Sequence, residues 1–302
     1  MSWIGSLIDS HAHLGEQEFD EEREALMRRA AEAGVEAVVV IGYNQESSQR
    51  ALELAAASAQ EAFRRAETAG SAMPLHGSSA PALYATVGFA PHNVAEASVD
   101  ALAVVENMIG QPRVVGVGEM GLDYHYDMPR DAQRELFAAQ LEWAVAADLP
   151  VVIHSRKAEE DVVALLRDGG AGSVTSATPN GSADPAGSSE TNQRLRGVIH
   201  CFTESAHMAR AVVDLGFYVS FSGILTFPSA ADLRKTAAEV PLGQTLIETD
   251  SPYLAPQPYR GRRNEPAFVG AVAEELAVIH ACDVEEVAEA TAGNARRLFG
   301  LV

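Results

Sequence analysis

Cysteine is almost absent from this sequence. Only two cysteines, Cys201 and Cys282, occur among the 302 residues. Two cysteines are too few for a disulfide framework, and this scarcity is typical of proteins that fold in a reducing compartment. We therefore expect both thiols to be free and to pack as small buried side chains.

Long hydrophobic runs are also missing. No apolar stretch approaches the roughly 20 residues that a transmembrane helix needs. The first ten residues, MSWIGSLIDS, have no basic segment ahead of an apolar run and soon reach Asp9, which is not the pattern of a secretory signal. We expect a cytoplasmic protein that makes no contact with a membrane.

Positive charge is scarce as well, because lysine occurs only at Lys157 and Lys235. Lysine and arginine together number 22 against 42 acidic residues, so the formal net charge is −20. A chain this acidic repels nucleic acid at long range, which excludes general, sequence-independent coating of DNA. It does not exclude local chemistry on a phosphodiester, since metal ions and a few arginines reverse the potential inside one cleft.

The sequence does contain 47% apolar residues, and they follow a regular rhythm. Short apolar runs alternate with helix-like segments, which is typical of parallel βα units. Eight such runs predict an α/β fold of the (β/α)8 TIM-barrel type. The predicted strands are Leu7–Asp9, Val35–Ile41, Tyr84–Val87, Val114–Gly118, Val151–His154, Val198–His200, Tyr218–Phe221 and Thr245–Glu248. The predicted helices include Glu21–Ala33, Ala95–Met108, Ala132–Ala147, Glu159–Leu166 and Ala206–Leu215.

Two segments rich in glycine, serine, proline and alanine interrupt this rhythm, at 71–82 and at 169–193. Because the βα pattern resumes after each, we expect flexible surface insertions within a single domain, 1–302, rather than linkers between two domains. His76 lies in the first insertion and is expected to be solvated. From Asn264 onward the pattern is helical, and Asn264 and Asp283 are expected to be N-cap residues.

The stretch LIDSHAHLGE, residues 7–16, places His11 and His13 at the end of the first predicted strand. Residues two apart on a strand point to the same face, so the two imidazoles are expected to lie side by side. Such a pair is either a set of metal ligands or a coincidence.

Four more groups that can bind a metal follow other predicted strands: Glu119, His154, His200 and Asp250. Taken alone, His154 or His200 fits a core histidine, Glu119 a helix cap and Asp250 a turn. All six, however, come at or just beyond carboxyl ends of strands, and in an eight-stranded barrel those ends form the active site. The joint pattern favours a common site.

Four imidazoles and two carboxylates fit two divalent ions that together activate a water molecule. We expect one ion near His11 and His13 and the other near His154 and His200, with Glu119 bridging them. Asp250 is expected to complete the first site and to accept a proton from the water. Mixed nitrogen and oxygen ligands allow zinc, manganese, nickel or magnesium.

The sequence also resembles the TatD family of metal-dependent hydrolases and deoxyribonucleases. The resemblance runs from Ile8 to about Phe299 and skips only the two insertions. It is carried by the stretches IDSHAH, VGFAPH, GEMGLDYHYD, PVVIHSRKAEED, GVIHCF, IETDSPYL and RRNEPAFV. It implies a TIM barrel that cleaves DNA, 3′ to 5′, with divalent metal bound by the same six residues.

One motif departs from the family pattern. Family members commonly have Gly-x-His-Pro after the third strand, whereas this chain has Ala90 in the histidine position, followed by Pro91 and His92. No role is therefore carried over to Ala90. His92 either substitutes from the neighbouring position or is an ordinary loop histidine. His125 and Asp127, shortly after Glu119, are further candidates for contact with the site.

Three arginines are candidates for binding the substrate. Arg156, two residues after His154, fits either a phosphate clamp or a structural ion pair. Arg262 and Arg263 form the most basic local cluster and fit either a nucleic-acid backbone contact or a solvated loop. Gly116 and Gly118 lack the spacing of a phosphate-binding loop.

These observations predict a divalent-metal-dependent deoxyribonuclease that prefers single-stranded ends of DNA. We expect it to be a monomer with no membrane contact and no stable protein partner. An amide or ester hydrolase, for example an aminoacyl-ester deacylase, is the alternative, since the same metal centre attacks a carbonyl and a barrel does not determine its substrate. A non-catalytic binding protein is the third possibility, and the complete set of ligand types argues against it.

Overall fold

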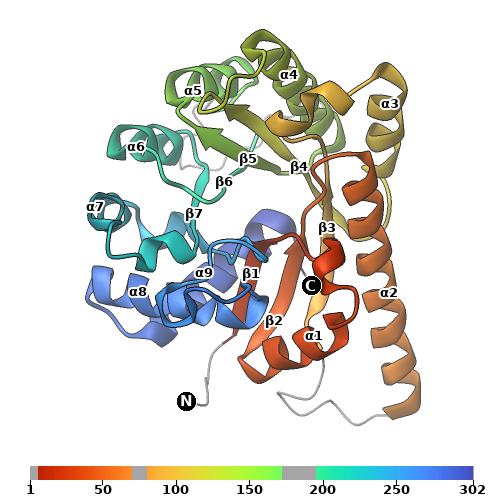
Figure 1. Ribbon diagram of the computed structural model, residues 1–302, viewed down its shortest axis with the longest axis vertical. Coiled ribbons are helices and arrows are strands. Elements are labelled where there is room, and N and C mark those ends of the chain that lie inside the picture. Colours follow the sequence, from red (N-terminus) through yellow and green to blue (C-terminus); the bar gives the residue numbers. More distant parts are fainter. Residues whose placement is uncertain (1–5, 70–79, 172–194, 302) are drawn as a thin grey trace, which may run out of the picture.

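The computed structural model describes residues 6–69, 80–171 and 195–301. Eight strands form one parallel sheet in chain order, and an isolated parallel bridge between Ala12 and Ser251 joins its two edges (Figure 1). The strands are β1 (Leu7–Ala12), β2 (Val35–Val40), β3 (Ala82–Val87), β4 (Val114–Asp123), β5 (Val151–Arg156), β6 (Gly197–Ile199), β7 (Tyr218–Phe221) and β8 (Thr245–Ile247).

Helices surround this barrel, as Figure 1 shows. They are α1 (Arg23–Glu32), α2 (Gln45–Ala69), α3 (Val99–Met108), α4 (Arg130–Ala147), α5 (Glu159–Asp168), α6 (Ala206–Asp214), α7 (Ala231–Glu239), α8 (Gly270–His280) and α9 (Val284–Phe299). Buried side chains such as Leu26, Phe137 and Val212 pack these helices against the outer surface of the barrel. The predicted TIM-barrel fold is thus confirmed.

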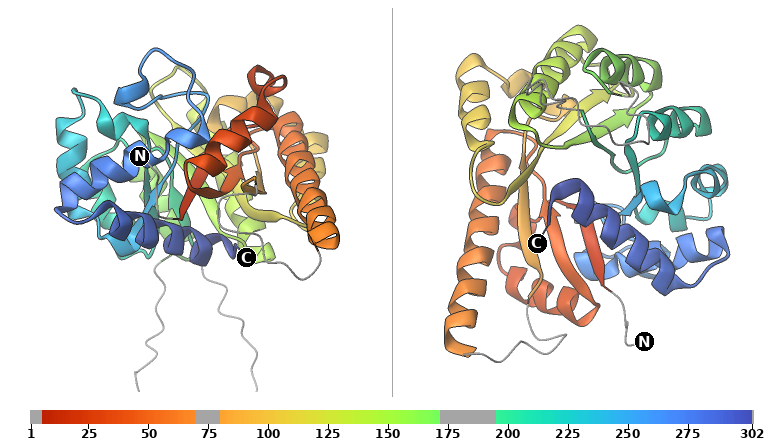
Figure 2. Two further views of the ribbon diagram at one scale, coloured as in Figure 1. Left: turned by 90° about the horizontal axis from the view of Figure 1, so that it is seen from below. Right: turned by 180° about the vertical axis from the view of Figure 1, so that it is seen from behind.

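The interior of the barrel holds a second, smaller core. One residue from each of several strands, such as Ile8, Val152 and Leu246, meets Leu298 and Phe299 of α9. Helix α9 therefore closes one end of the barrel, and the left view of Figure 2 shows it lying across that end. Because apolar side chains fill this end, the polar groups of the strands gather at the other end.

The structure corrects several predicted boundaries. Strand β4 runs on to Asp123, so Glu119 lies inside a strand rather than after it. Ala82, which composition assigned to the first insertion, begins β3. Ala171, assigned to the second insertion, is buried just after α5. Most of the two predicted insertions, namely 71–79 with His76 and 172–193, lies outside the described residues.

One of the two predicted N-cap residues is confirmed. Asp283 is the N-cap residue of α9, although its side chain makes no capping hydrogen bond. The prediction for Asn264 was wrong, because α8 starts at Gly270 after a short 3-10 turn, Pro266–Phe268. The buried Asn264 amide instead donates to the backbone carbonyls of Thr249 and Tyr253, at 2.8 and 2.6 Å. It ties together the loop that follows β8.

Both cysteines are free, but each is half-buried rather than buried. Within residues 6–69, 80–171 and 195–301, no helix has the length and apolar character needed to cross a membrane.

We predict that Phe299→Ala lowers the free energy of unfolding by about 3–5 kcal/mol, because it opens a cavity between α9 and the barrel interior. Phe299 is 4% exposed and Phe63, on α2, is 65% exposed. Phe63→Ala is therefore the matched control and should change stability by less than about 0.5 kcal/mol. Urea unfolding followed by circular dichroism measures both, and equal losses would contradict the role assigned to α9.

Candidate metal centre

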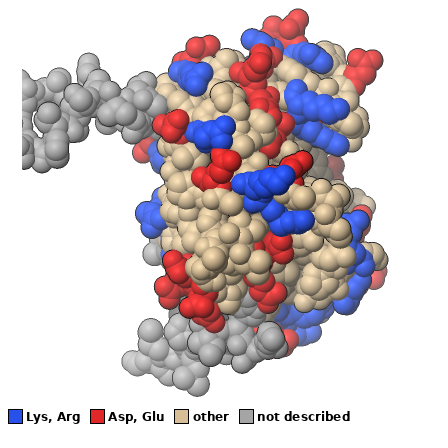
Figure 3. Space-filling view, turned by 90° about the vertical axis from the view of Figure 1, so that its left-hand side faces the viewer, with Lys and Arg blue, Asp and Glu red and all other residues tan. Residues whose placement is uncertain are grey.

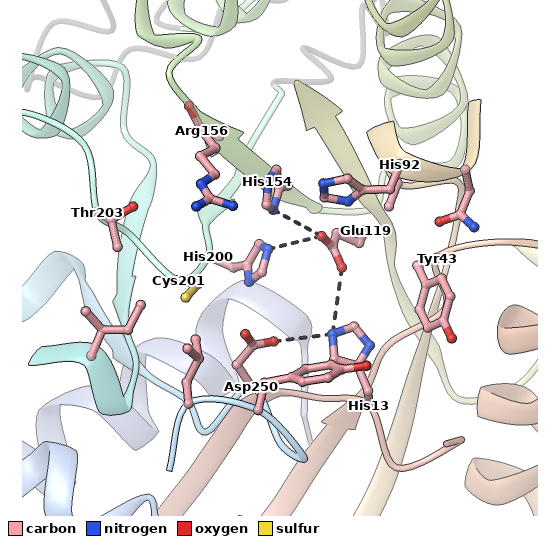
Figure 4. Close-up of a pocket in the computed structure, with 16 residues that line it drawn as sticks. His13, Tyr43, His92, Glu119, His154, Arg156, His200, Cys201, Thr203 and Asp250 are labelled. Atoms are coloured by element: carbon pink, nitrogen blue, oxygen red, sulfur yellow. Dashed lines mark ion pairs between the residues drawn. The ribbon is translucent and has the colours of Figure 1, made fainter. Parts of the chain in front are cut away.

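Glu119 lies at the centre of the polar end of the barrel. Its carboxylate is buried, and each oxygen faces a different group of imidazoles (Figure 4). Oε1 is 3.3 Å from His154 Nδ1 and 3.3 Å from His200 Nε2. Oε2 is 3.8 Å from His11 Nε2 and 3.9 Å from His13 Nε2. The structure thus brings all four predicted histidines around one carboxylate.

Asp250 completes the group around His11 and His13. Its Oδ1 atom lies 3.6 Å from His11 Nε2 and 3.3 Å from His13 Nε2, and the two Nε2 atoms are 3.3 Å apart. Two imidazole nitrogens and two carboxylate oxygens therefore converge at one point. His154, His200 and the other oxygen of Glu119 converge at a second point. Between them, these two points use all six residues predicted from strand ends.

The backbone around β1 and β8 explains how the first group is assembled. Asp250 N donates to His11 O, and His13 N donates to Ser251 O, at 2.9 and 2.8 Å. The pairing of β1 with β2 shifts register between Asp9 and Ala12, next to His11. Asp250 itself has a φ of 57°, a left-handed conformation that is rare outside glycine and concentrates at functional sites.

Asp9 is buried beside this group but faces away from it, toward the loop after β8. It accepts hydrogen bonds from Thr249 N and Thr249 Oγ1, at 2.9 and 2.6 Å. Burial raises the pKa of Asp9 to about 7, against the opposing effect of the Thr249 hydrogen bonds. Asp9 therefore joins β1 to the segment that carries Asp250, and it is not one of the converging donors.

Two glycines let β4 approach β5 closely on the other side of the site. Gly118 and Gly121 have φ values of 135° and 136°, and a Cβ atom there would lie 2.5 Å from Val152 O or 2.0 Å from His154 O. Only glycine fits such contacts. Both glycines belong to β4, in agreement with a sequence that lacks the spacing of a phosphate-binding loop. By letting β4 approach β5, they place Glu119 beside His154.

Two further buried carboxylates, Asp123 and Glu248, orient the histidines of the second group. His154 Nε2 donates to Asp123 Oδ2 at 3.2 Å, and His200 Nδ1 lies 3.4 Å from Glu248 Oε1. Each contact occupies one ring nitrogen and leaves the other directed at Glu119. Carboxylates commonly set the tautomer of metal-binding histidines in this way.

Sequence reasoning missed both of these carboxylates. Asp123 is the last residue of β4, and Glu248 comes two residues before Asp250. Their position at or near strand ends was the available indication.

The charges of the group depend on one another. Burial acts to raise the pKa of Glu119, but the imidazoles, His200 foremost, hold it well below its usual value. Burial acts to lower the pKa of His200, yet the Glu119 and Glu248 carboxylates raise it well above normal. Asp250 likewise raises the pKa of His13 against the effect of burial. His11 differs, because burial and the neighbouring His200 push its pKa well below normal.

These residues fit a metal centre. His200 Nε2 is a buried nitrogen without a hydrogen-bond partner, and it points at the carboxylate that would share a cation with it. The same carboxylates that raise the pKa values of His13 and His200 would attract a divalent cation in place of protons. Imidazole and carboxylate donors suit zinc, manganese, nickel or, with added water, magnesium.

The site opens into a cavity of about 660 Å³. Arg156 lines it and is the one arginine among its described lining residues, with its guanidinium over the Tyr126 ring, 5.4 Å from the centroid. Arg262 and Arg263 do not line it. Arg263 is bound to Glu22 and to the Glu18 carbonyl, and Arg262 lies over Phe268.

His92 and Ala90 both form part of the cavity wall. His92 Nε2 lies 2.8 Å from Asp123 Oδ2, and its ring is 5.2 Å from that of His154. His92 thus shares a carboxylate with a candidate ligand but does not face Glu119. His125 does not line the cavity; its ring packs against Tyr126, and its backbone N–H donates to Asp123 Oδ1 at 2.8 Å. Asp127 does not line the cavity.

A parallel barrel that presents histidines and carboxylates at the open end of its strands has the architecture of metal-dependent hydrolases. The model of one family, described as TatD related DNase, matches residues 8–300. The chain belongs to this family.

Individual relatives agree with this assignment. An uncharacterized metal-dependent hydrolase of Bacillus subtilis (strain 168), YabD, is 35% identical over 294 residues, or 97% of this chain and 98% of that protein. The 3′-5′ ssDNA/RNA exonuclease TatD of Erwinia amylovora is 29% identical over 301 residues, or 98% and 100%. The crystal structure of YjjV, a TatD homolog from Escherichia coli K12, has a TM-score of 0.79 at 27% identity and 98% coverage of both chains.

We predict that Glu248→Gln weakens binding of one ion by about 10- to 100-fold, because a neutral amide orients the His200 ring less firmly. Competition with a fluorescent zinc chelator measures the affinity. The exposed Glu274 on α8 provides the matched control, and Glu274→Gln should bind metal as the wild type does. Unchanged affinity in a folded Glu248→Gln protein would show that Glu248 does not position a ligand.

Proposed function

We propose that this protein is a deoxyribonuclease that hydrolyses phosphodiester bonds, 3′ to 5′, from single-stranded ends, using two divalent metal ions. The observation that carries the proposal is the Glu119 carboxylate, which directs one oxygen at each of two imidazole groups inside a single cavity. The nuclease activity in the name of the Erwinia amylovora relative, which is matched over nearly its whole length, supports the choice of substrate.

The proposed ligands divide between two ions. His11, His13 and Asp250 would hold the first, His154 and His200 the second, and Glu119 both. Ions bound in this way activate water and neutralise charge that develops on a phosphate. The barrel strands hold these imidazoles and carboxylates in place, at β1, β4 and β5 and at the ends of β6 and β8. The site therefore needs little reorganisation to bind the two ions.

Two side chains have further roles in the proposed reaction. The Asp250 carboxylate points into the cavity toward His13 and would accept the proton of the attacking water (Figure 4). Arg156 lies on the opposite side of the cavity, and its planar guanidinium would hold two phosphate oxygens. Contact of Arg262 and Arg263 with a more distant part of the DNA strand stays a prediction.

The charge of the protein and the size of the cavity favour binding of a DNA end over binding to the middle of a DNA strand. The net charge is −20, and on the face shown in Figure 3 basic and acidic side chains are interspersed, with no continuous basic band among the described residues. The face shown therefore offers little surface for holding a long duplex, and the net negative charge acts against such binding as well. A cavity of about 660 Å³ falls in the size range of small-ligand pockets and can admit one terminal nucleotide.

The direct test is a nuclease assay with end-labelled single-stranded DNA. After treatment with a chelator the protein should be inactive, and manganese, zinc, nickel or magnesium added singly should restore stepwise release of nucleotides from the 3′ end. A parallel assay with p-nitrophenyl acetate and an aminoacyl ester tests the alternative. Metal-dependent ester hydrolysis without nuclease activity would overturn the proposal in favour of a carbonyl hydrolase.

We predict that His154→Ala and His200→Ala each lower the bound metal by about one ion per chain and abolish most of the nuclease activity, because both serve one site. The exposed His207 on α6 provides the control, and His207→Ala should keep the metal content and activity of the wild type. Elemental analysis of the dialysed proteins measures the metal. A full metal complement in the folded His154→Ala and His200→Ala proteins would remove both residues from the centre.

A further inference from the structure

Two tyrosines stand out on the surface of the protein. Six large apolar side chains are exposed among the described residues, and Tyr126 and Tyr253, each 51% exposed, are the tyrosines in that group. Both lie beside the cavity. Tyr253 lines it directly, and Tyr126 packs against Arg156 and His92, which also line it. Aromatic rings left open to water at a binding site are candidates for contact with ligand.

The backbone of Tyr253 is held by two hydrogen bonds although its ring is exposed. Its N–H donates to Asp250 O at 3.0 Å, and its carbonyl accepts from the buried Asn264 amide at 2.6 Å. The ring meets His13 edge-on, with centroids 5.9 Å apart. Because the backbone at Tyr253 is already ordered, only the side chain loses conformational freedom when a ligand stacks on the ring.

The wall around Tyr253 is suited to a neutral, apolar group. Leu254 and Ile224 line the same cavity. Glu16, which is not a proposed metal ligand, adds negative charge here, because its carboxylate accepts a hydrogen bond from Tyr43, and Tyr43 packs edge-on against the same His13 ring as Tyr253 does. Phosphate would be repelled here, whereas a nucleobase carries no charge.

A second hollow, on the far side of His13 and Tyr43, continues this acidic surface. Glu16, Glu18 and Glu46 line it, and its one described arginine, Arg50, is bound to Asp20 at 2.6 Å. A phosphate backbone would not follow this path. The opposite wall of the main cavity offers Arg156 over the exposed Tyr126 ring instead.

We infer that Tyr253 is the stacking platform for the base of the terminal nucleotide, and that the rest of the strand leaves past Arg156 and Tyr126. This inference rests on the nuclease function proposed above. The phosphate next to the terminal nucleotide would lie between Glu119 and Arg156, and the acidic hollow would prevent the strand from continuing beyond Tyr253. Base stacking tolerates any sequence, because every base has an aromatic face.

A binding experiment tests this role without turnover. The manganese-loaded protein is titrated with 2′-deoxyguanosine 5′-monophosphate and with 2-deoxyribose 5-phosphate, which lacks only the base. The wild type should bind the nucleotide about 5- to 150-fold more tightly. Tyr253→Leu should remove most of this difference, whereas Tyr253→Phe should keep it. Phe63→Leu, at an exposed aromatic residue on α2, is the control and should match the wild type.

Kinetics on oligonucleotides provide the second readout. Tyr253→Leu should raise KM for a single strand with a 3′-terminal base by about 5- to 150-fold, with a smaller change in kcat and with unchanged metal content. A strand that ends in an abasic residue should show little change. The inference would be overturned, and the proposed function left standing, by either of two results. One is a wild type with equal KM for base-ended and abasic-ended strands, and the other is a Tyr253→Leu protein with the KM of the wild type. A wild type that cleaves no nucleic acid would overturn the proposed function together with the inference.

Discussion

The buried carboxylate of Glu119 is the constraint on which the rest of the site depends. A negative charge taken out of water inside a barrel is strongly unfavourable unless positive charge meets it. Four imidazoles surround Glu119, and three of them have raised pKa values because carboxylates face them. Protons or divalent cations can supply the balancing charge. The arrangement of donor atoms, with one carboxylate oxygen for each group, fits the two-cation centre proposed above.

The barrel makes this concentration of charge possible. Helix α9 fills one end of the barrel with Leu298 and Phe299, and the outer helices bury the apolar side chains on the outer face of the strands. This apolar packing stabilises the fold at a distance from the polar site. The open end is free to carry buried polar groups such as Asp9, Asp123 and Glu248, each of which is held by hydrogen bonds rather than by apolar packing.

Much of this organisation is predictable from the sequence, for a physical reason. Parallel strands in a barrel bring their carboxyl ends together, so His11, His154 and His200 can be assigned to one site without any knowledge of distances. Strand lengths were less predictable. The strand predicted to end at Gly118 runs on through Gly121 to Asp123 in β4, where both glycines allow a close approach to β5 that composition does not reveal.

The orientation of side chains was not predictable. Alternation along a strand cannot show that His154 uses Nδ1 and His200 uses Nε2 toward Glu119, because this depends on Asp123 and Glu248 from other strands. Asn264 illustrates the same limit. Its residue type and position suit a helix cap, but its amide is used to hold the loop that carries Asp250 and Tyr253.

Anomalous scattering from crystals soaked in manganese tests the central claim most directly, because it locates each ion independently of activity. We predict two peaks about 3.5–4 Å apart, one beside His11 and His13 and the other beside His154 and His200, with the Glu119 carboxylate between them. A single peak at full occupancy, or two peaks of which one makes no contact with Glu119, would contradict it.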